Sequence, residues 1–113
     1  MLVERKEYNE KDGTLGYVES IFKSSNILKT TYFPKMRRLY ISFNRGNTYS
    51  YGNISEEFYK EFEDSESHGK FFFKNIKSKP KDYPYRMEFS LYPREVEDVK
   101  KIIKENLNEE EDE

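Results

Sequence analysis

Basic and aromatic side chains alternate between positions 70 and 86, and this mixture is the strongest indication of chemistry in the sequence. The basic residues are Lys70, Lys74, Lys77, Lys79, Lys81 and Arg86, and the rings between them are Phe71, Phe72, Phe73, Tyr83 and Tyr85. Lysine and arginine contact phosphates, while rings stack on bases, each stack contributing roughly 1–3 kcal/mol. Arg37, Arg38 and Arg45 add charge near the ends of a predicted hairpin. The segment predicts binding of RNA or another phosphate-bearing nucleotide; the alternative is a solvated loop whose rings fill the core.

Residues for catalysis are scarce. The chain has one histidine, His68, and no cysteine, so no Cys–His pair is available. No phosphate-binding glycine loop, dinucleotide-binding fingerprint or metalloprotease helix is present, and no carboxylates have the spacing of a calcium loop. Ser67 and His68 precede Gly69 in a polar stretch, which predicts loop residues that are exposed or form hydrogen bonds, and that could make a polar contact with a ligand. We therefore expect a non-catalytic protein with no metal and no cofactor.

Two tyrosines, Tyr49 and Tyr51, are spaced one residue apart after a glycine turn. A two-residue loop would put both on the face of Tyr40. A three-residue loop, with Gly46 in the left-handed region, would put both on the face of Ile41 and separate apolar from polar side chains more cleanly. The second arrangement predicts core-facing tyrosines. Their hydroxyls could still reach the rim of a site, where the candidate stacking residues are Tyr49, Tyr51, Phe73, Tyr83 and Tyr85.

The elements that would position these residues indicate an α+β domain over residues 1–107, with an antiparallel sheet of hairpins covered by a short helix. Predicted strands span residues 2–8, 14–22, 26–33, 39–43, 48–52 and 86–92. Predicted helices span residues 54–65, with Asn53 and Glu56 at capping-box spacing, and residues 93–107 after Pro93. Gly69 and two prolines predict irregular structure over residues 67–86. The last strand and helix are a C-terminal addition to the core domain.

Length and charge bound the remaining possibilities. A chain of 113 residues predicts a single domain. Residues 20–94 have fourteen basic and eight acidic side chains, whereas residues 95–113 have three basic and nine acidic. The acidic tail, residues 108–113, predicts disorder.

The first residues lack the apolar segment of a signal peptide, and no stretch predicts a membrane span, so we expect a cytoplasmic protein. Absence of alanine alongside abundant Lys, Asn, Phe and Tyr indicates an AT-rich genome, such as that of a low-GC bacterium or its phage.

From about residue 24 to residue 86 the chain resembles the KTSC domain family. The family pattern has Ser and Ile at a first strand, matched by Ser24 and Ile27, and a Tyr matched by Tyr32. Its central pair of tyrosines is matched by Tyr49-Ser50-Tyr51, and its S-x-G motif by Ser67-His68-Gly69, followed by Lys70-Phe71-Phe72. Phe33, Ser55 and Phe73 stand where the family often has Asp, Pro and Asn. The resemblance implies RNA binding, because the domain is attached to some lysyl-tRNA synthetases.

These observations lead to one principal function and two alternatives. The principal function is a non-catalytic binding module for RNA or another phosphate-bearing nucleotide. One alternative is a protein–protein inhibitor or adaptor, such as a phage counter-defence protein that blocks a host factor in the host cytoplasm. The other is a homo-oligomer that sequesters a nucleotide signal. No membrane partner is expected.

Overall fold

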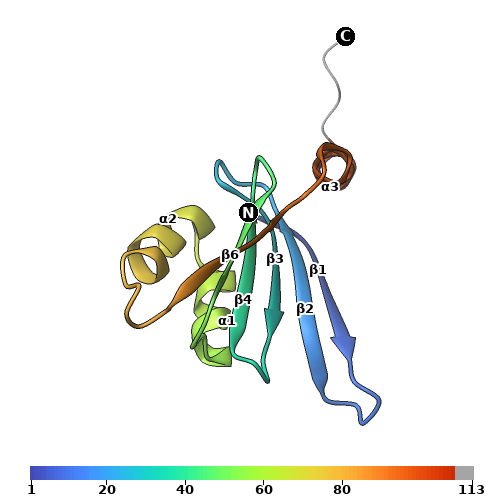
Figure 1. Cartoon of the computed structure of the whole chain (residues 1–113). Coiled ribbons are helices and arrows are strands. Elements are labelled where there is room, and N and C mark those ends of the chain that lie inside the picture. Colours follow the sequence, from blue (N-terminus) through green and yellow to red (C-terminus); the bar gives the residue numbers. More distant parts are fainter. Residues whose placement is uncertain (109–113) are drawn as a thin grey trace.

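A six-stranded antiparallel sheet, with its strands in chain order, forms the framework of the computed structural model, which describes residues 1–108 (Figure 1). The strands are β1 (Leu2–Asn9), β2 (Leu15–Phe22), β3 (Ile27–Phe33), β4 (Arg38–Phe43), β5 (Asn47–Tyr51) and β6 (Tyr85–Ser90). The helices are α1 (Glu56–Asp64), α2 (His68–Phe72), the π-helix η1 (Phe73–Lys77) and α3 (Pro93–Asn106). The predicted α+β fold with an added C-terminal strand and helix is confirmed. The predicted disorder of the acidic tail concerns residues that, from 109 on, lie outside the described part of the chain.

The β4–β5 hairpin has the predicted three-residue loop. Gly46 has a φ of 100°, and its N–H donates to the carbonyl oxygen of Phe43 at 2.8 Å. Ile41 pairs with Tyr49 and Leu39 with Tyr51. Directly paired residues share a face of the sheet, so both tyrosines lie on the apolar face. The prediction that they face the core is therefore confirmed.

Helices α1 and α2 cover this apolar face and enclose a core that is largely aromatic. Tyr32 stacks on Tyr59 with ring centroids 4.4 Å apart, and the Tyr32 hydroxyl donates to the carbonyl oxygen of Ile54 at 2.7 Å. The α1 cap differs from the prediction. Asn53 has a φ of 60° and lies outside the helix, whereas Ser55 is extended and its hydroxyl accepts from the N–H of Phe58. Ser55 is thus the residue that satisfies the free donors of the first turn.

The segment 68–77 is helical, so the prediction of irregular structure is wrong there. The Ser67 hydroxyl caps α2 by accepting from the N–H of Lys70. Gly69 does not break the helix but permits close packing, because a Cβ atom there would lie 3.1 Å from Nδ2 of Asn26. Phe72 and Ile76 are fully buried. Burial of these two side chains against the sheet stabilises a helix that local propensity does not predict.

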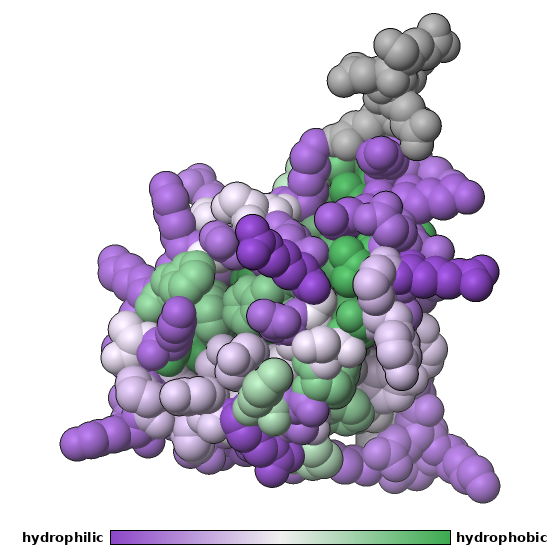
Figure 2. Space-filling view, turned by 45° about the horizontal axis from the view of Figure 1, so that its top comes forward, coloured by the Kyte–Doolittle hydropathy of each residue, from purple (hydrophilic) through white to green (hydrophobic). Residues whose placement is uncertain are grey.

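Helix α3 lies on the opposite face of the sheet, at one end and apart from α1 and α2 (Figure 1). Val96 and Ile103 of α3 form a second, smaller core with Ile21 and Leu28. Hydrophilic side chains cover much of the surface visible in Figure 2, and apolar surface shows between them in several patches. One contribution to apolar surface comes from β6, where Met87 is 64% exposed. The strand predicted over residues 86–92 is present as β6. Because β6 is an edge strand, its apolar side chains are not all in the core.

Candidate functional site

Two adjoining clefts flank the helical segment 68–77, and Phe73 lies in both. The first, here called the polar cleft, is lined by Ser25, Asn26, Ser67, Gly69, Lys70, Phe73 and Lys74. The second, here called the aromatic cleft, has a volume of about 530 Å³ and is lined by Phe43, Asn47, Tyr49, Tyr51, Phe72, Phe73, Lys77, Pro80 and Tyr85. Concave surfaces that combine rings with a few polar groups are typical of ligand sites.

The wall of the polar cleft opposite α2 is the β2–β3 loop, which is held by hydrogen bonds. The Ser24 hydroxyl accepts from the backbone N–H of Asn26 at 3.2 Å and of Ile27 at 3.3 Å. Asn44 connects this loop to the β4–β5 turn through two hydrogen bonds. Its side-chain amide donates to the carbonyl oxygen of Ser24 at 2.9 Å, and its backbone N–H donates to the carbonyl oxygen of Asn26 at 2.9 Å. The polar cleft is thus bounded by an ordered loop and a capped helix.

The aromatic cleft is built on the tyrosines of β5. The Tyr85 ring lies 6.3 Å from the rings of both Tyr49 and Tyr51. Tyr51 is 5% exposed and contacts Phe72 edge to face at 5.1 Å, whereas Phe73 is 41% exposed. Burial, together with the neighbouring tyrosines, raises the pKa of Tyr51 well above its usual range. The Tyr51 phenol is therefore neutral at physiological pH. The exposed rings of the cleft, Phe73 and Tyr85, are available for stacking.

Positive charge surrounds the two clefts. Lys70 and Lys74 line the polar cleft, and Lys77 lines the aromatic cleft, with its Nζ 4.9 Å from the centroid of the Phe73 ring. Within residues 1–108, none of the three lysines forms an ion pair, and no described carboxylate lines either cleft. Two other concave regions of the surface differ in this respect, because they contain Glu10 with Asp12 and Glu56 with Glu63.

The structure gathers only part of the predicted site. It brings together Ser67, Lys70, Phe73, Lys74, Lys77, Tyr49, Tyr51 and Tyr85. Arg38 and Arg86 lie on the opposite face of the sheet, where Arg38 Nε donates to Ser50 Oγ at 2.9 Å and Arg86 pairs with Glu88 at 2.6 Å. Tyr83 stacks on Phe58 at 4.9 Å. The other predicted basic residues line neither cleft: Arg37, Arg45, Lys79 and Lys81.

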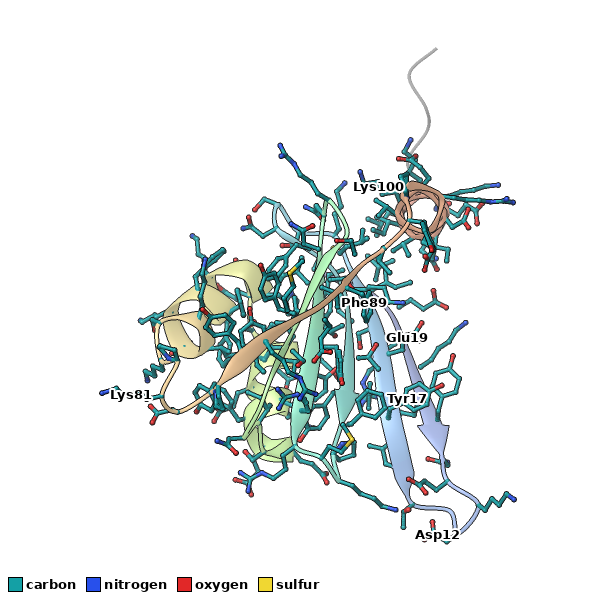
Figure 3. All side chains as sticks on the ribbon, in the orientation of Figure 1. Asp12, Tyr17, Glu19, Lys81, Phe89 and Lys100 are labelled. Atoms are coloured by element: carbon teal, nitrogen blue, oxygen red, sulfur yellow. The ribbon has the colours of Figure 1, made fainter. Side chains whose placement is uncertain are left out.

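Figure 3 shows Lys81 near the tip of the turn before β6, pointing away from the fold. Its position agrees with a solvated loop residue and separates it from the helical lysines. Sequence reasoning missed four polar or aromatic lining residues, namely Ser25, Asn26, Phe43 and Asn47. Each lies at the end of a strand or in the adjoining loop. No local spacing joins these positions, because only the tertiary fold places both strand ends beside α2 and η1.

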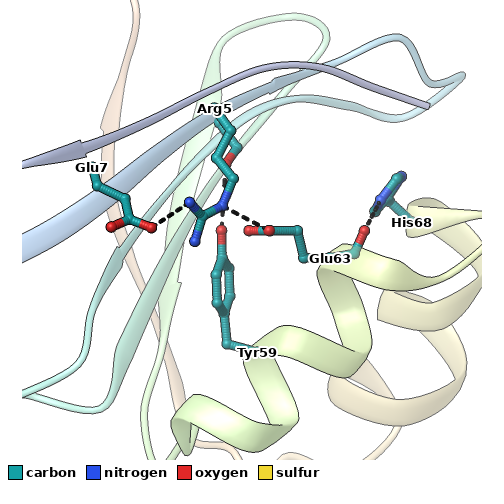
Figure 4. A network of polar contacts seen from close by, with 6 residues as sticks. Arg5, Glu7, Tyr59, Glu63 and His68 are labelled. Carbon is teal, nitrogen blue, oxygen red and sulfur yellow. Dashed lines mark hydrogen bonds and ion pairs between the residues drawn. The ribbon is translucent and has the colours of Figure 1, made fainter.

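His68 is a buried helix residue, so the predictions of exposure and of a loop are wrong for it, whereas the alternative prediction of a hydrogen bond agrees with the structure. Its side chain is 3% exposed, and the ring lies 4.4 Å from that of Phe22. Its Nε2 lies 2.9 Å from the carbonyl oxygen of Glu63, which identifies Nε2 as the protonated nitrogen (Figure 4). The Glu63 carboxylate in turn accepts from Arg5 at 2.7 Å. His68 thus joins α2 to the end of α1, and burial lowers its pKa.

The lowered pKa of His68 predicts a loss of stability in mild acid. An unfolded histidine titrates near pH 6.5. Because the folded pKa is lower, the folded state resists protonation, so the stabilisation is present above about pH 6.5 and decreases as the pH falls below it. Urea unfolding between pH 7.5 and 5.5 should show this decrease, with a slope of at most about 1.4 kcal/mol per pH unit. His68→Gln, which keeps an N–H donor, should flatten the slope. An equal slope in both proteins would assign the effect to other groups.

Among residues 1–108, no group of three or more His, Cys, Asp or Glu side chains is placed to hold a metal ion. No helix in this range is both long enough and apolar enough to cross a membrane.

Comparison with known proteins identifies a family and a similar solved structure. Residues 23–79 match the family model described as the KTSC domain. The crystal structure of a KTSC domain protein from Yersinia pestis is similar to this one with a TM-score of 0.57 and 32% sequence identity, over 63% of this chain and 96% of that chain. No curated protein matches. The matched residues contain the whole helical segment of the clefts, whereas β1, β2, β6 and α3 lie outside them.

Proposed function

The chain belongs to the KTSC domain family, and we propose that it is a non-catalytic binding module for a phosphate-bearing nucleotide unit, held in the two clefts around Phe73. One observation carries this proposal. The clefts combine partly exposed rings with three lysines, and no described carboxylate lines them. A base can stack on the rings while its phosphate is neutralised by the lysines.

The two clefts offer different groups to a bound nucleotide. The aromatic cleft offers the rings of Phe73, Tyr49 and Tyr85 to a flat group. The polar cleft offers Lys70 and Lys74 and, beside them, the hydroxyl of Ser67 and the amide of Asn26. Phosphate oxygens accept hydrogen bonds from ammonium, hydroxyl and amide groups. Since Phe73 borders both clefts, one nucleotide can use both types of contact.

A binding titration with Phe73→Ala tests the proposal. The wild type is titrated at low salt with adenosine and uridine nucleotides and with a short unstructured RNA. Phe73→Ala should weaken binding by roughly 5- to 150-fold, the equivalent of one stacked base at about 1–3 kcal/mol. The fold should survive, because this ring is 41% exposed. The matched control is Tyr92→Ala, which removes an exposed ring at the start of α3. Absence of wild-type binding to every one of these ligands would refute the proposal.

The same surface supports a second candidate function. Phe73, Tyr85 and Met87 are 41%, 60% and 64% exposed, and exposed apolar groups that lie close together often mark protein-binding surfaces. A protein–protein inhibitor or adaptor, such as a counter-defence protein blocking a host factor, would use this apolar surface. It would bind no nucleotide, so the titration also separates the two functions. Sequestration of a nucleotide signal by an oligomer would appear as nucleotide binding together with a mass above that of one chain in sedimentation.

A further inference from the structure

We infer that the nucleotide bound around Phe73 is part of an unpaired polynucleotide strand that crosses both clefts. The inference rests on the proposed function and narrows it, because a free nucleotide or a double helix could also present phosphates to lysines. Three features of the surface favour the strand: the lysines on both sides of Phe73, the second exposed ring on β6, and the position of the rings within open clefts.

The first feature is positive charge on both sides of Phe73. Lys70 belongs to α2, and Lys74 and Lys77 belong to the π-helix η1 that follows it. Lys70 and Lys74 line the polar cleft, while Lys77 lines the aromatic cleft. The phosphates of a free nucleotide all lie on one side of its base, whereas a backbone that passes Phe73 offers a phosphate to each side.

The second feature is a second place to stack. Tyr85 is 60% exposed at the outer edge of the aromatic cleft. Met87 pairs with Tyr49 across β5 and β6, so its side chain projects from the same face of the sheet. Apolar surface therefore continues from the cleft onto the edge strand. A base bound at Phe73 leaves Tyr85 and Met87 for the next base of the same strand.

The third feature separates an unpaired strand from a duplex. Phe73 and Tyr85 line a cleft and do not project from a convex surface. Bases in a double helix are already stacked on their neighbours, so their faces cannot reach such rings. Unpaired bases can be splayed into a cleft and stacked there. A duplex would use the lysines alone, and the aromatic half of the site would stay empty.

A series of oligonucleotides of increasing length tests the inference directly. Binding at low salt is compared for uridine monophosphate, for oligouridine and oligothymidine of two, four and eight nucleotides, and for a blunt RNA duplex. Affinity should rise at least tenfold from the mononucleotide to the tetranucleotide and then level off, and the duplex should bind less tightly than the tetranucleotide. RNA and DNA strands are tested separately, because the contacts described above favour an unpaired strand and do not distinguish ribose from deoxyribose.

Two variants locate the strand on the surface. Tyr85→Ala should lower the affinity for the tetranucleotide at least fivefold more than it lowers the affinity for the mononucleotide; Phe73→Ala should lower both affinities by similar factors. Tyr92→Ala should change neither. Equal affinity for mononucleotide and tetranucleotide, or a duplex that binds as tightly as the tetranucleotide, would overturn the inference and leave the proposed function standing. Failure of every ligand to bind would overturn both.

Discussion

Tyr51→Ala is expected to lower the free energy of unfolding by roughly 3 kcal/mol or more, as large-to-small aromatic substitutions in cores do. The Tyr51 ring is 5% exposed, contacts Phe72 edge to face at 5.1 Å and supports Tyr85 at 6.3 Å. Its removal leaves a cavity between β5 and α2 that the surrounding rings cannot fill without moving. Urea denaturation followed by circular dichroism, with the wild type and the variant under identical conditions, measures the change.

Two milder variants make this result interpretable. Tyr51→Phe keeps the ring and removes only the hydroxyl, so it should cost much less than the alanine variant. Tyr51→Leu preserves part of the volume and gives a folded protein if the alanine variant does not fold. The prediction is wrong if Tyr51→Ala unfolds at the same urea concentration as the wild type. If such a variant had also lost its ligand, the ring would serve as a binding platform and not as a core residue.

The register of the central hairpin could be predicted from sequence because two independent patterns agree on it. Gly46 can adopt a positive φ without strain, and only the three-residue loop separates the apolar side chains of β4 and β5 from the polar ones. Ser42 and Thr48 indeed face each other on the opposite side of the sheet, with their hydroxyl oxygens 2.7 Å apart. Local chemistry and alternation thus determined which face the tyrosines occupy.

The helical segment 68–77 could not be predicted in the same way because its stability comes from long-range contacts. Gly69 is read locally as a helix breaker, yet here its lack of a Cβ allows Asn26 to approach. His68 is read locally as polar, yet its ring packs between Phe22 and Phe62 and its Nε2 bonds to Glu63. The available signals were Ser67 as a helix cap and the spacing of Phe72 and Ile76, which is helical.

The helical conformation of residues 68–77 also explains why the predicted basic residues separate into two groups. In a loop, all the lysines from 70 to 81 would be equivalent. In the structure, Lys70, Lys74 and Lys77 lie in helical segments and line the clefts, whereas Lys79 and Lys81 fall in the following turn. Arg38 and Arg86 separate for a different reason: neighbouring strand residues point to opposite faces of a sheet, and Ser50, which lies beside both arginines, alternates with Tyr49 and Tyr51.

Replacing the three cleft lysines by glutamine is expected to have the largest effect on binding. Each phosphate contact to a single strand contributes about 0.7 to the slope of log affinity against log salt. Loss of all three contacts should reduce that slope by about 2 and the affinity at 0.1 M salt by roughly a hundredfold. Glutamine keeps helix propensity close to that of lysine, and exposed charges contribute little to stability. Thermal unfolding should therefore stay near that of the wild type, while fluorescence anisotropy at several salt concentrations measures binding.

The matched control replaces three exposed helical lysines remote from the clefts, Lys60, Lys100 and Lys101, by glutamine. This control changes the net charge by the same amount, so it isolates the position of the charge from its quantity. A second control, Lys79→Gln with Lys81→Gln, tests the two lysines in the turn after η1. If all three variants lose affinity equally, binding depends on diffuse charge and the clefts are not the site. If the cleft variant keeps the wild-type salt slope, its lysines contact no phosphate. Only a loss confined to Lys70, Lys74 and Lys77 supports phosphate recognition by the lysines of the clefts, because stacking on Phe73 responds weakly to salt.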